Sequence, residues 1–103
     1  MQKELAILIT TYNRPQLAKK CIKSIQNLAE PPDVPLICFV DRHKGDSDKE
    51  LNEETIEIAK ELKSQNYLDE VVLREKNFGT ALNVTNSVSE VLSEYESVFV
   101  VED

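Results

Sequence analysis

Apolar and polar residues alternate along the chain in blocks, and the apolar blocks predict four strands. Residues 5–9 (LAILI), 36–40 (LICFV) and 97–101 (SVFVV) are short apolar runs of the kind found in strands that are covered on both faces. Residues 70–74 (EVVLR) form a more polar run, which suits a strand at the edge of a sheet. The pattern therefore predicts three buried strands and one edge strand.

The segment after the first strand has the period of an amphipathic helix. Lys19, Lys20 and Lys23 point outward, whereas the apolar residues fall on one face. Asn13 is placed to cap this helix, and Pro15 lies in its first turn. The predicted inner face consists of Leu17, Cys21, Ile25 and Leu28.

Two further helices are predicted from the same period. The first of them begins with Ser47 and Glu50, which have the S-x-x-E spacing of a capping box. Its predicted inner face is Leu51, Thr55, Ile58, Ala59 and Leu62. The second opens after the loop REKNFGT, and its predicted inner face is Ala81, Thr85, Val88 and Leu92.

Strands and helices thus alternate through the chain with short connections. Such alternation predicts an α/β fold in which helices cover both faces of a parallel sheet through right-handed crossovers. We expect a single Rossmann-like, three-layer α/β/α domain over residues 1–103, with the strands in the order 3-2-1-4. In sheets of this type ligands bind beyond the carboxyl ends of the strands where the strand order reverses, here between the first and fourth strands.

The charge of the chain limits which ligands this edge can bind. With 12 basic and 19 acidic residues, the 103-residue chain carries a net charge of −7, which argues against nucleic acid as a partner. An anionic small ligand would also be repelled unless a metal ion or helix N-termini offset the charge locally. Phosphate binding therefore requires a local positive group, such as a bound metal ion or a helix N-terminus.

The composition is that of a folded soluble domain, with 41% hydrophobic and 30% charged residues. No apolar run approaches the roughly 20 residues needed to span a bilayer, and the start of the chain lacks the features of a signal peptide. We therefore expect a cytoplasmic protein, with association at the membrane face left open. The apolar surroundings of Cys21 and Cys38 predict two buried thiols rather than a disulfide.

Polar residues follow three of the predicted strands and should gather at one edge of the sheet. They are Thr10, Thr11, Tyr12 and Asn13 after the first strand, Asp41 after the second, and Glu102 and Asp103 after the fourth. Their carboxylates, hydroxyls and aromatic ring suit metals and sugars. The chain contains no G-x-G-x-x-G, no P-loop motif, no paired metal-ligand cysteines and only one histidine, which argues against dinucleotide, P-loop and zinc sites.

In the order of these motifs the sequence resembles the GT-A class of glycosyltransferases, especially family-2-like members. Such proteins open with an apolar strand followed by T-Y-N-R-P and a helix, as residues 11–15 do here. The resemblance continues through Asp41, the N-x-G element of Asn77 and Gly79, and the run VFVVED. It covers essentially the whole chain, and four motifs in the right order form a fairly specific combination.

The resemblance implies a transferase that moves a sugar from a nucleoside diphosphate donor, foremost a UDP-sugar, to a carbohydrate or lipid-linked acceptor, as in polysaccharide biosynthesis. It implies that Thr10, Tyr12 and Asp41 contact the base and ribose and that Arg14 approaches the diphosphate. The implied nucleotide-binding set is Thr10, Thr11, Tyr12, Arg14, Asp41, Asn77 and Gly79. Glu102 and Asp103 match the start of the D-x-D or E-D-D motif that holds a divalent cation, Mn²⁺ or Mg²⁺.

On this interpretation residues 1–103 are the donor-binding part of a GT-A domain. We expect the last carboxylate of the metal motif, the acceptor-binding half and the catalytic base to follow Asp103, so that residues 1–103 alone lack transferase activity. Many relatives carry two adjacent aspartates where this chain has Asp41 and Arg42. The outer edge of the fourth strand would be open to pairing, which would permit a homodimer.

Simpler interpretations of the same residues stay open. Asp41 can be a loop starter or a cap, and Tyr12 a surface aromatic residue. Asn77-Phe78-Gly79 can be a turn in which glycine supplies a backbone conformation that other residues disfavour. His43 is expected to be an exposed loop residue.

Two other functions also stay open. A sugar nucleotidyltransferase shares the architecture but usually has a glycine-rich, basic loop after the first strand, and this chain has no such loop. A non-catalytic interaction module with the same fold would use the acidic surface to bind a partner protein.

Overall fold

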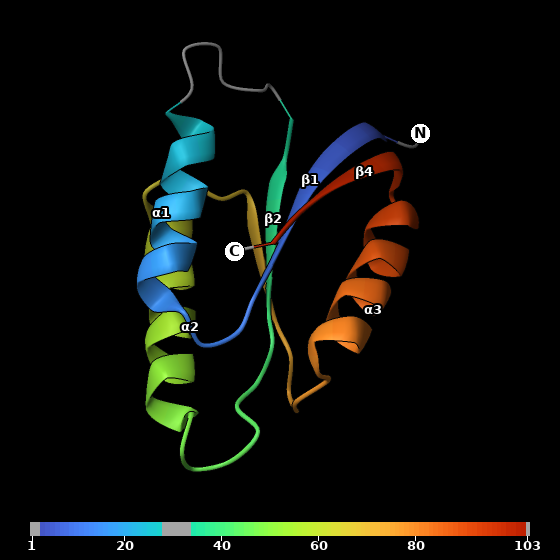
Figure 1. The fold of residues 1–103 in the computed structure, drawn as a ribbon. Coiled ribbons are helices and arrows are strands. Elements are labelled where there is room, and N and C mark those ends of the chain that lie inside the picture. Colours follow the sequence, from blue (N-terminus) through green and yellow to red (C-terminus); the bar gives the residue numbers. More distant parts are fainter. Residues whose placement is uncertain (1–2, 28–33, 103) are drawn as a thin grey trace.

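Strands and helices alternate along the chain in the order that the apolar pattern predicts. The computed structural model describes residues 3–27 and 34–102. The elements are β1 (Lys3–Thr11), α1 (Pro15–Gln26), β2 (Leu36–Val40), α2 (Lys49–Ser64), β3 (Glu70–Leu73), α3 (Thr80–Leu92) and β4 (Tyr95–Glu102). Figure 1 shows α1 and α2 on one face of the sheet and α3 on the other, so the predicted three-layer α/β/α arrangement is confirmed.

The four strands are parallel and lie in the order β3-β2-β1-β4, as the sequence predicts. Thr11 at the end of β1 pairs with Val40 at the end of β2, and Thr10 pairs with Glu102 at the end of β4. Val40 in turn pairs with Leu73 at the end of β3. The carboxyl ends of all four strands therefore meet at one edge of the sheet, which we call the carboxyl rim.

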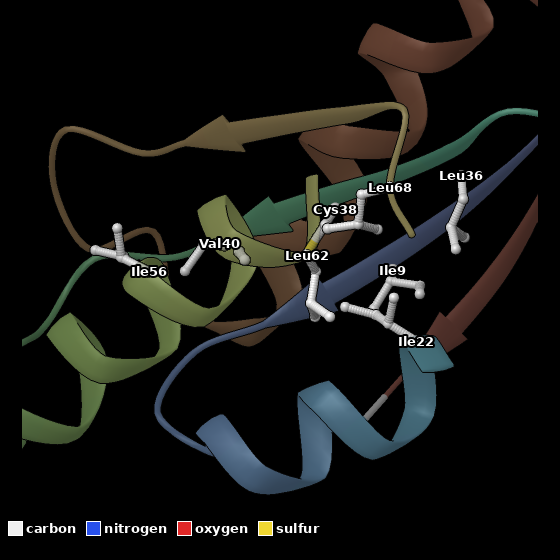
Figure 2. Packing of buried hydrophobic residues seen from close by; sticks show 9 residues of the cluster. Ile9, Ile22, Leu36, Cys38, Val40, Ile56, Leu62 and Leu68 are labelled. Atoms are coloured by element: carbon white, nitrogen blue, oxygen red, sulfur yellow. The ribbon is translucent and has the colours of Figure 1, made fainter. Parts of the chain in front are cut away.

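Two apolar clusters hold the layers together. On the face covered by α1 and α2, Ile22 of α1 lies against Ile9 of β1, and Leu62 of α2 lies near Cys38 of β2 (Figure 2). On the other face, Val91 of α3 packs in the second cluster. That second cluster comprises Ala6, Leu8, Ile37, Phe39, Val91 and Tyr95. The alternation of cluster membership along β1 and β2 reflects the period of two of a strand that is buried on both faces.

Helix α1 turns a different face to the sheet from the one the spacing predicts. The buried residues are Pro15, Ala18 and Ile22, whereas Leu17 is 53% exposed. Pro15 is itself buried, and residues one and two turns after it then face the core because the helix repeats every 3.6 residues. The predicted inner residues Cys21 and Ile25 are only half-buried, and Leu28 lies outside the described residues.

The predicted cap of α1 is also wrong. Arg14, and not Asn13, occupies the N-cap position, and its side chain makes no capping hydrogen bond. Pro15 at the first helical position needs no amide partner, so this terminus has one fewer donor to satisfy.

Helix α2 departs from prediction at its first turn. Asp48, and not Ser47, is the N-cap, and no side chain caps the helix. The Asp48 carboxylate instead accepts the backbone N–H groups of Lys44 and Gly45, at 3.2 and 3.1 Å, and so closes the preceding loop on itself. Leu51 is 47% exposed. The residues that face inward are Asn52, Thr55, Ile56, Ala59 and Leu62.

The inner face of α3 is more polar than predicted. Asn83, Ser87 and Val91 are buried, with Ser87 fully so. The predicted inner residues Ala81, Thr85 and Leu92 are exposed, and Val88 is half-buried. The helix is rotated because a buried arginine, described below, lies beneath it and needs polar partners.

The two edges of the sheet differ. β3 is an edge strand, as predicted, although it ends at Leu73, one residue before the predicted end. At the other edge β4 pairs with β1 alone among the described strands, and Phe99 of β4 is 63% exposed. The homodimer expected through this edge stays a prediction.

Three further findings concern the expectations about cysteines, histidine and the membrane. Cys38 is buried, but Cys21 is only half-buried, and both are thiols rather than a disulfide. His43 is half-buried instead of exposed, and its Nδ1 atom is shielded from solvent without a hydrogen-bond partner. Within residues 3–27 and 34–102, no helix has the length and apolar character needed to cross a bilayer.

The observed face of α1 leads to a test by paired truncations. Ile22→Ala should lower the free energy of unfolding by about 2–4 kcal/mol, because it leaves a cavity in a close-packed cluster. Leu17→Ala on the same helix should change it by no more than about 0.5 kcal/mol, because Leu17 is exposed. Urea unfolding followed by circular dichroism measures both, and a larger loss for Leu17→Ala would contradict the observed orientation of α1.

Candidate functional site

The polar residues predicted to follow β1 and β2 lie side by side at the carboxyl rim. Thr10 and Thr11 are 7% and 4% exposed, and Asp41 is 3% exposed. The backbone N–H of Asp41 donates to the carbonyl oxygen of Thr11 at 3.0 Å, which extends the pairing of the two strands by one step. The loops that follow β1, β2 and β3 all lie at this end of the sheet (Figure 1).

The buried carboxylate of Asp41 accepts four hydrogen bonds from two loops. Its Oδ1 atom accepts the backbone N–H groups of Arg42 at 2.9 Å and Phe78 at 2.8 Å. Its Oδ2 atom accepts the backbone N–H of Gly79 at 3.0 Å and the side-chain Nδ2 of Asn77 at 3.4 Å. The negative charge is thus held by N–H dipoles at the N-terminus of α3, where the helix favours an anion.

The N-x-G element is the turn that brings these donors to Asp41. Gly79 has φ of 81° and is the N-cap of α3, a backbone conformation that residues with a Cβ atom rarely adopt. Asn77 donates from Nδ2 to the carbonyl oxygen of Arg42 at 2.8 Å, which ties the loop after β3 to the loop after β2. The expectation that Gly79 supplies a backbone conformation that other residues disfavour is therefore confirmed.

Tyr12 and Arg14 take up different positions in the turn after β1. Tyr12 is half-buried, and its hydroxyl oxygen accepts the backbone N–H of Lys44 at 3.1 Å. The carbonyl oxygen of Tyr12 accepts Nδ2 of Asn52 at 2.7 Å, and the same amide donates to the carbonyl oxygen of Asp41 at 2.8 Å. Arg14 is exposed at the start of α1. The Tyr12 hydroxyl thus links the turn after β1 to the loop after β2, whereas Arg14 is exposed at the rim.

Arg74, directly after β3, forms a second buried polar centre under α3. Its residue exposure is 8%, and its guanidinium group lies between the rings of Phe39 and Phe78, 4.9 and 4.7 Å from their centroids. Nε donates to Oδ1 of Asn83 at 3.0 Å, and Nη2 donates to Oγ of Ser87 at 2.8 Å. These contacts explain why α3 turns Asn83 and Ser87 inward.

We call Arg74 and its partners Phe39, Phe78, Asn83 and Ser87 the Arg74 cluster. This cluster and the Asp41 carboxylate both contact the loop that follows β3. Phe78 stacks its ring on the guanidinium group of Arg74 and donates its backbone N–H to Asp41. Nη2 of Arg74 also lies 2.8 Å from Oε2 of Glu90, whose side chain is 52% exposed. The turn before α3 is therefore held by one buried cation and one buried anion.

The metal-binding expectation rests on the end of β4. Glu102 pairs with Thr10, so the backbone of β4 reaches the carboxyl rim beside the end of β1. Asp103 lies outside the described residues. Within the part of the chain that the structure describes, no group of three histidine, cysteine or acidic side chains is placed to hold a metal ion.

Several basic residues lie in the loops of the rim despite the acidic balance of the whole chain. Arg14 follows β1, Arg42 and Lys44 follow β2, and Lys76 follows β3. Arg42 is half-buried, and the other three are exposed. These cations offset part of the acidic charge at the end of the sheet where an anionic ligand would bind.

Sequence reasoning missed two residues that organise the site, Asn52 and Arg74. Asn52 lies on the helical period of Thr55, Ile56 and Ala59, so a polar residue at a core-facing position of α2 was a signal that could have identified it. Arg74 gave a weaker signal, because an arginine at the end of an edge strand is ordinarily exposed. Its burial depends on Asn83 and Ser87, which lie 9 and 13 residues further along the chain, in α3.

Comparison with known proteins identifies one family. The model of glycosyl transferase family 2 matches residues 6–101. No curated protein and no solved structure matches the chain significantly. The matched range includes the turn after β1, Asp41, the N-x-G turn and most of β4.

The network around Asp41 can be tested by removing its charge. Asp41→Asn should lower the free energy of unfolding by about 2–4 kcal/mol, because one carboxylate oxygen is replaced by an NH₂ group that faces N–H donors. Asp46→Asn, at an exposed position in the same loop, should change it by about 0.5 kcal/mol or less. Equal effects of the two substitutions in urea unfolding would show that the hydrogen bonds of Asp41 contribute nothing specific.

Substitutions of Arg74 and of its exposed partner Glu90 should have unequal effects on the free energy of unfolding. Arg74→Leu should cost about 2–4 kcal/mol of unfolding free energy, since it leaves Asn83 and Ser87 without their donor beneath α3. Glu90→Ala should cost about 1 kcal/mol or less, because the Glu90 side chain is half exposed and its ion pair is screened by water. Thermal and urea unfolding measure both; a cost for Glu90→Ala as large as that for Arg74→Leu would locate the stabilisation in the ion pair instead.

Proposed function

The chain belongs to glycosyl transferase family 2, and on that premise we propose that its carboxyl rim binds the nucleoside diphosphate part of a nucleotide-sugar donor. The family makes glycosyl transfer the reaction class. The finer assignment, to a UDP-sugar and a carbohydrate or lipid-linked acceptor, is our proposal. The observation that carries it is a buried carboxylate, Asp41, held next to an aromatic residue, Tyr12, at the strand ends.

The geometry of Asp41 leaves one place for a ligand donor. Oδ1 already accepts two short hydrogen bonds, at 2.9 and 2.8 Å. Oδ2 accepts one at 3.0 Å and a long one, at 3.4 Å, from Asn77, whose amide has a shorter partner at 2.8 Å in the Arg42 carbonyl. An N–H donor such as the imide of uracil could replace the long contact at Oδ2 without leaving Asn77 unpartnered.

Tyr12 supports the same placement of a base. Its ring is half-buried, and its position is fixed by the hydroxyl contact with Lys44 and by the carbonyl contact with Asn52. A fixed aromatic ring offers a stacking surface to a base at little cost in conformational entropy. Thr10 and Thr11, at the end of β1, would then lie on the ribose side of the same site.

We assign the diphosphate to the side of the rim formed by Arg14 and the end of β4. Arg14 is exposed and carries a fixed positive charge. Glu102, which ends β4 and pairs with Thr10, and Asp103, the next residue in the sequence, would hold Mg²⁺ or Mn²⁺. The carboxylate oxygens of these two residues are hard ligands of the kind these ions prefer, and the ion would offset the charge of the departing diphosphate. The catalytic base is not assigned to any residue of the described rim.

An amide-resolved NMR titration tests donor binding. UDP with Mg²⁺ should shift the amide signals of residues 10–12, 41–42 and 77–79, whereas ADP should shift them less because the adenine ring has no N–H to donate to Oδ2 of Asp41. GDP, whose guanine has a ring N–H on a larger purine, tests whether the site also selects a pyrimidine. Asp41→Asn should weaken the UDP response by about tenfold or more, since Oδ2 is lost as an acceptor of fixed position.

The Asp46→Asn variant is the control for a general effect of charge, and it should respond to UDP as the wild-type chain does. Shifts of equal size with all three nucleotides would contradict a uracil-specific site. No shift with any nucleotide, from a chain whose spectrum shows that it is folded, would contradict donor binding by residues 1–103.

A further inference from the structure

Asn52 joins the two segments that carry the proposed base contacts. It lies in the first turns of α2, is fully buried, and donates from one amide nitrogen to the carbonyl oxygens of Tyr12 at 2.7 Å and Asp41 at 2.8 Å. The two acceptors belong to the turn after β1 and to the end of β2, which are 40 and 11 residues away along the chain. One side chain therefore ties these two segments together just beyond the last backbone hydrogen bond between β1 and β2, which the Asp41 N–H donates to Thr11.

The orientation of the Asn52 amide is fixed by its partners. Both contacts of Nδ2 are carbonyl oxygens, so the reversed amide would place Oδ1 against two acceptors. In the observed orientation Oδ1 is shielded from solvent and has no hydrogen-bond partner. A buried acceptor without a partner lowers stability. Asparagine at this position therefore costs some stability through its unpartnered Oδ1 atom. Its Nδ2 atom, by contrast, joins the two loops of the rim.

We propose that Asn52 is a positioning residue for the nucleotide site, acting through the backbones of Tyr12 and Asp41. This rests on the proposed function. By fixing the two carbonyl groups, Asn52 sets how far the Tyr12 ring lies from Oδ2 of Asp41, and so whether a base can stack on one and donate to the other. The bond between the Tyr12 hydroxyl and the Lys44 N–H is exposed, and water competes for it more than for the contacts of the buried amide.

Two substitutions and one control separate positioning from stability. Asn52→Leu removes both donated bonds and retains a side chain of similar size. Asn52→Asp keeps the shape but replaces the NH₂ group by a carboxyl oxygen. Thr55→Val is the matched control, because Thr55 is also fully buried, one turn further along α2, and its hydroxyl donates only to the carbonyl oxygen of Leu51 in the same helix, at 2.8 Å.

Amide hydrogen exchange of the ligand-free chain is the first measurement. Asn52→Leu should accelerate exchange in residues 12–14 and 41–45 by about tenfold or more relative to the rest of the chain, since those segments lose their common partner. Thr55→Val should change exchange evenly along the chain or only around α2. UDP affinity, measured by titration and expressed per folded molecule, should fall by about tenfold for Asn52→Leu and by less than about twofold for Thr55→Val.

Asn52→Asp adds a pH profile that a general loss of stability would not produce. Burial beside two carbonyl oxygens raises the pKa of the introduced carboxyl, which can donate one bond while protonated and none when ionised. UDP affinity relative to wild type should therefore fall as the pH rises from about 5 to about 8. The titratable residues in hydrogen-bond contact with this position are Tyr12, Asp41 and Asp48, each through its carbonyl oxygen. Wild type carries them all, so the ratio at each pH removes their contribution.

The outcomes separate this proposal from the proposed function. If wild type does not respond to UDP, donor binding is wrong, and the exchange measurement still decides whether Asn52 couples the two segments. If wild type binds UDP and Asn52→Leu binds it equally well per folded molecule, or if its exchange changes resemble those of Thr55→Val, the positioning role is overturned. A pH-independent affinity ratio for Asn52→Asp would overturn it as well.

Discussion

The structure at the carboxyl rim depends on one buried carboxylate. Asp41 is 3% exposed, and its charge would be costly there without the N–H groups of Arg42, Phe78 and Gly79. Hydrogen bonds to a charged group contribute about 1.5–3 kcal/mol each. In satisfying this charge the chain brings the loop after β3 and the start of α3 to the end of β2. A site made from segments far apart in sequence is thereby assembled around a single residue.

Arg74 gives this arrangement its second support. Its guanidinium group lies between two aromatic rings and bonds to the inner face of α3, so the helix is held both at its N-terminus and along its length. Phe78 links the two centres, since its ring contacts Arg74 and its backbone N–H contacts Asp41. The buried cation also explains why an interior helix face can contain Asn83 and Ser87. Without a donor beneath them, those side chains would be better placed in water.

The strands and their order could be predicted from the sequence, because the apolar runs of β1, β2 and β4 fit few structures other than buried strands. A continuous apolar run needs cover on both faces, and βαβ connections then restrict the topology. The helix faces were predicted less well, since the spacing of apolar residues in α1 did not reveal that Pro15 is buried. In α2 and α3 the inward-facing residues include Asn52 and Ser87. Both are polar, so a prediction based on the spacing of apolar residues does not identify them.

For the site, the sequence identified residues at the strand ends but not the bonds that hold them. Asp41 and Gly79 are close because of the parallel topology, and that could be predicted. That the carboxylate accepts the Gly79 N–H could not, because it depends on the φ of 81° at Gly79 and on the rotation of α3 over Arg74. Side-chain partners of this kind are decided by tertiary packing, which a single sequence does not specify.

A carboxylate that already has partners can serve a ligand better than a freely rotating one. The three backbone contacts fix the direction of Oδ2, and the long contact from Asn77 is the one that a ligand can displace at the least cost. Because the side chain is ordered before binding, little conformational entropy is lost when a base donates to it. Asp41 accepts hydrogen bonds from the loop before α3, and we propose that it also accepts one from the nucleotide base. The two roles are compatible, because the first orients the carboxylate for the second.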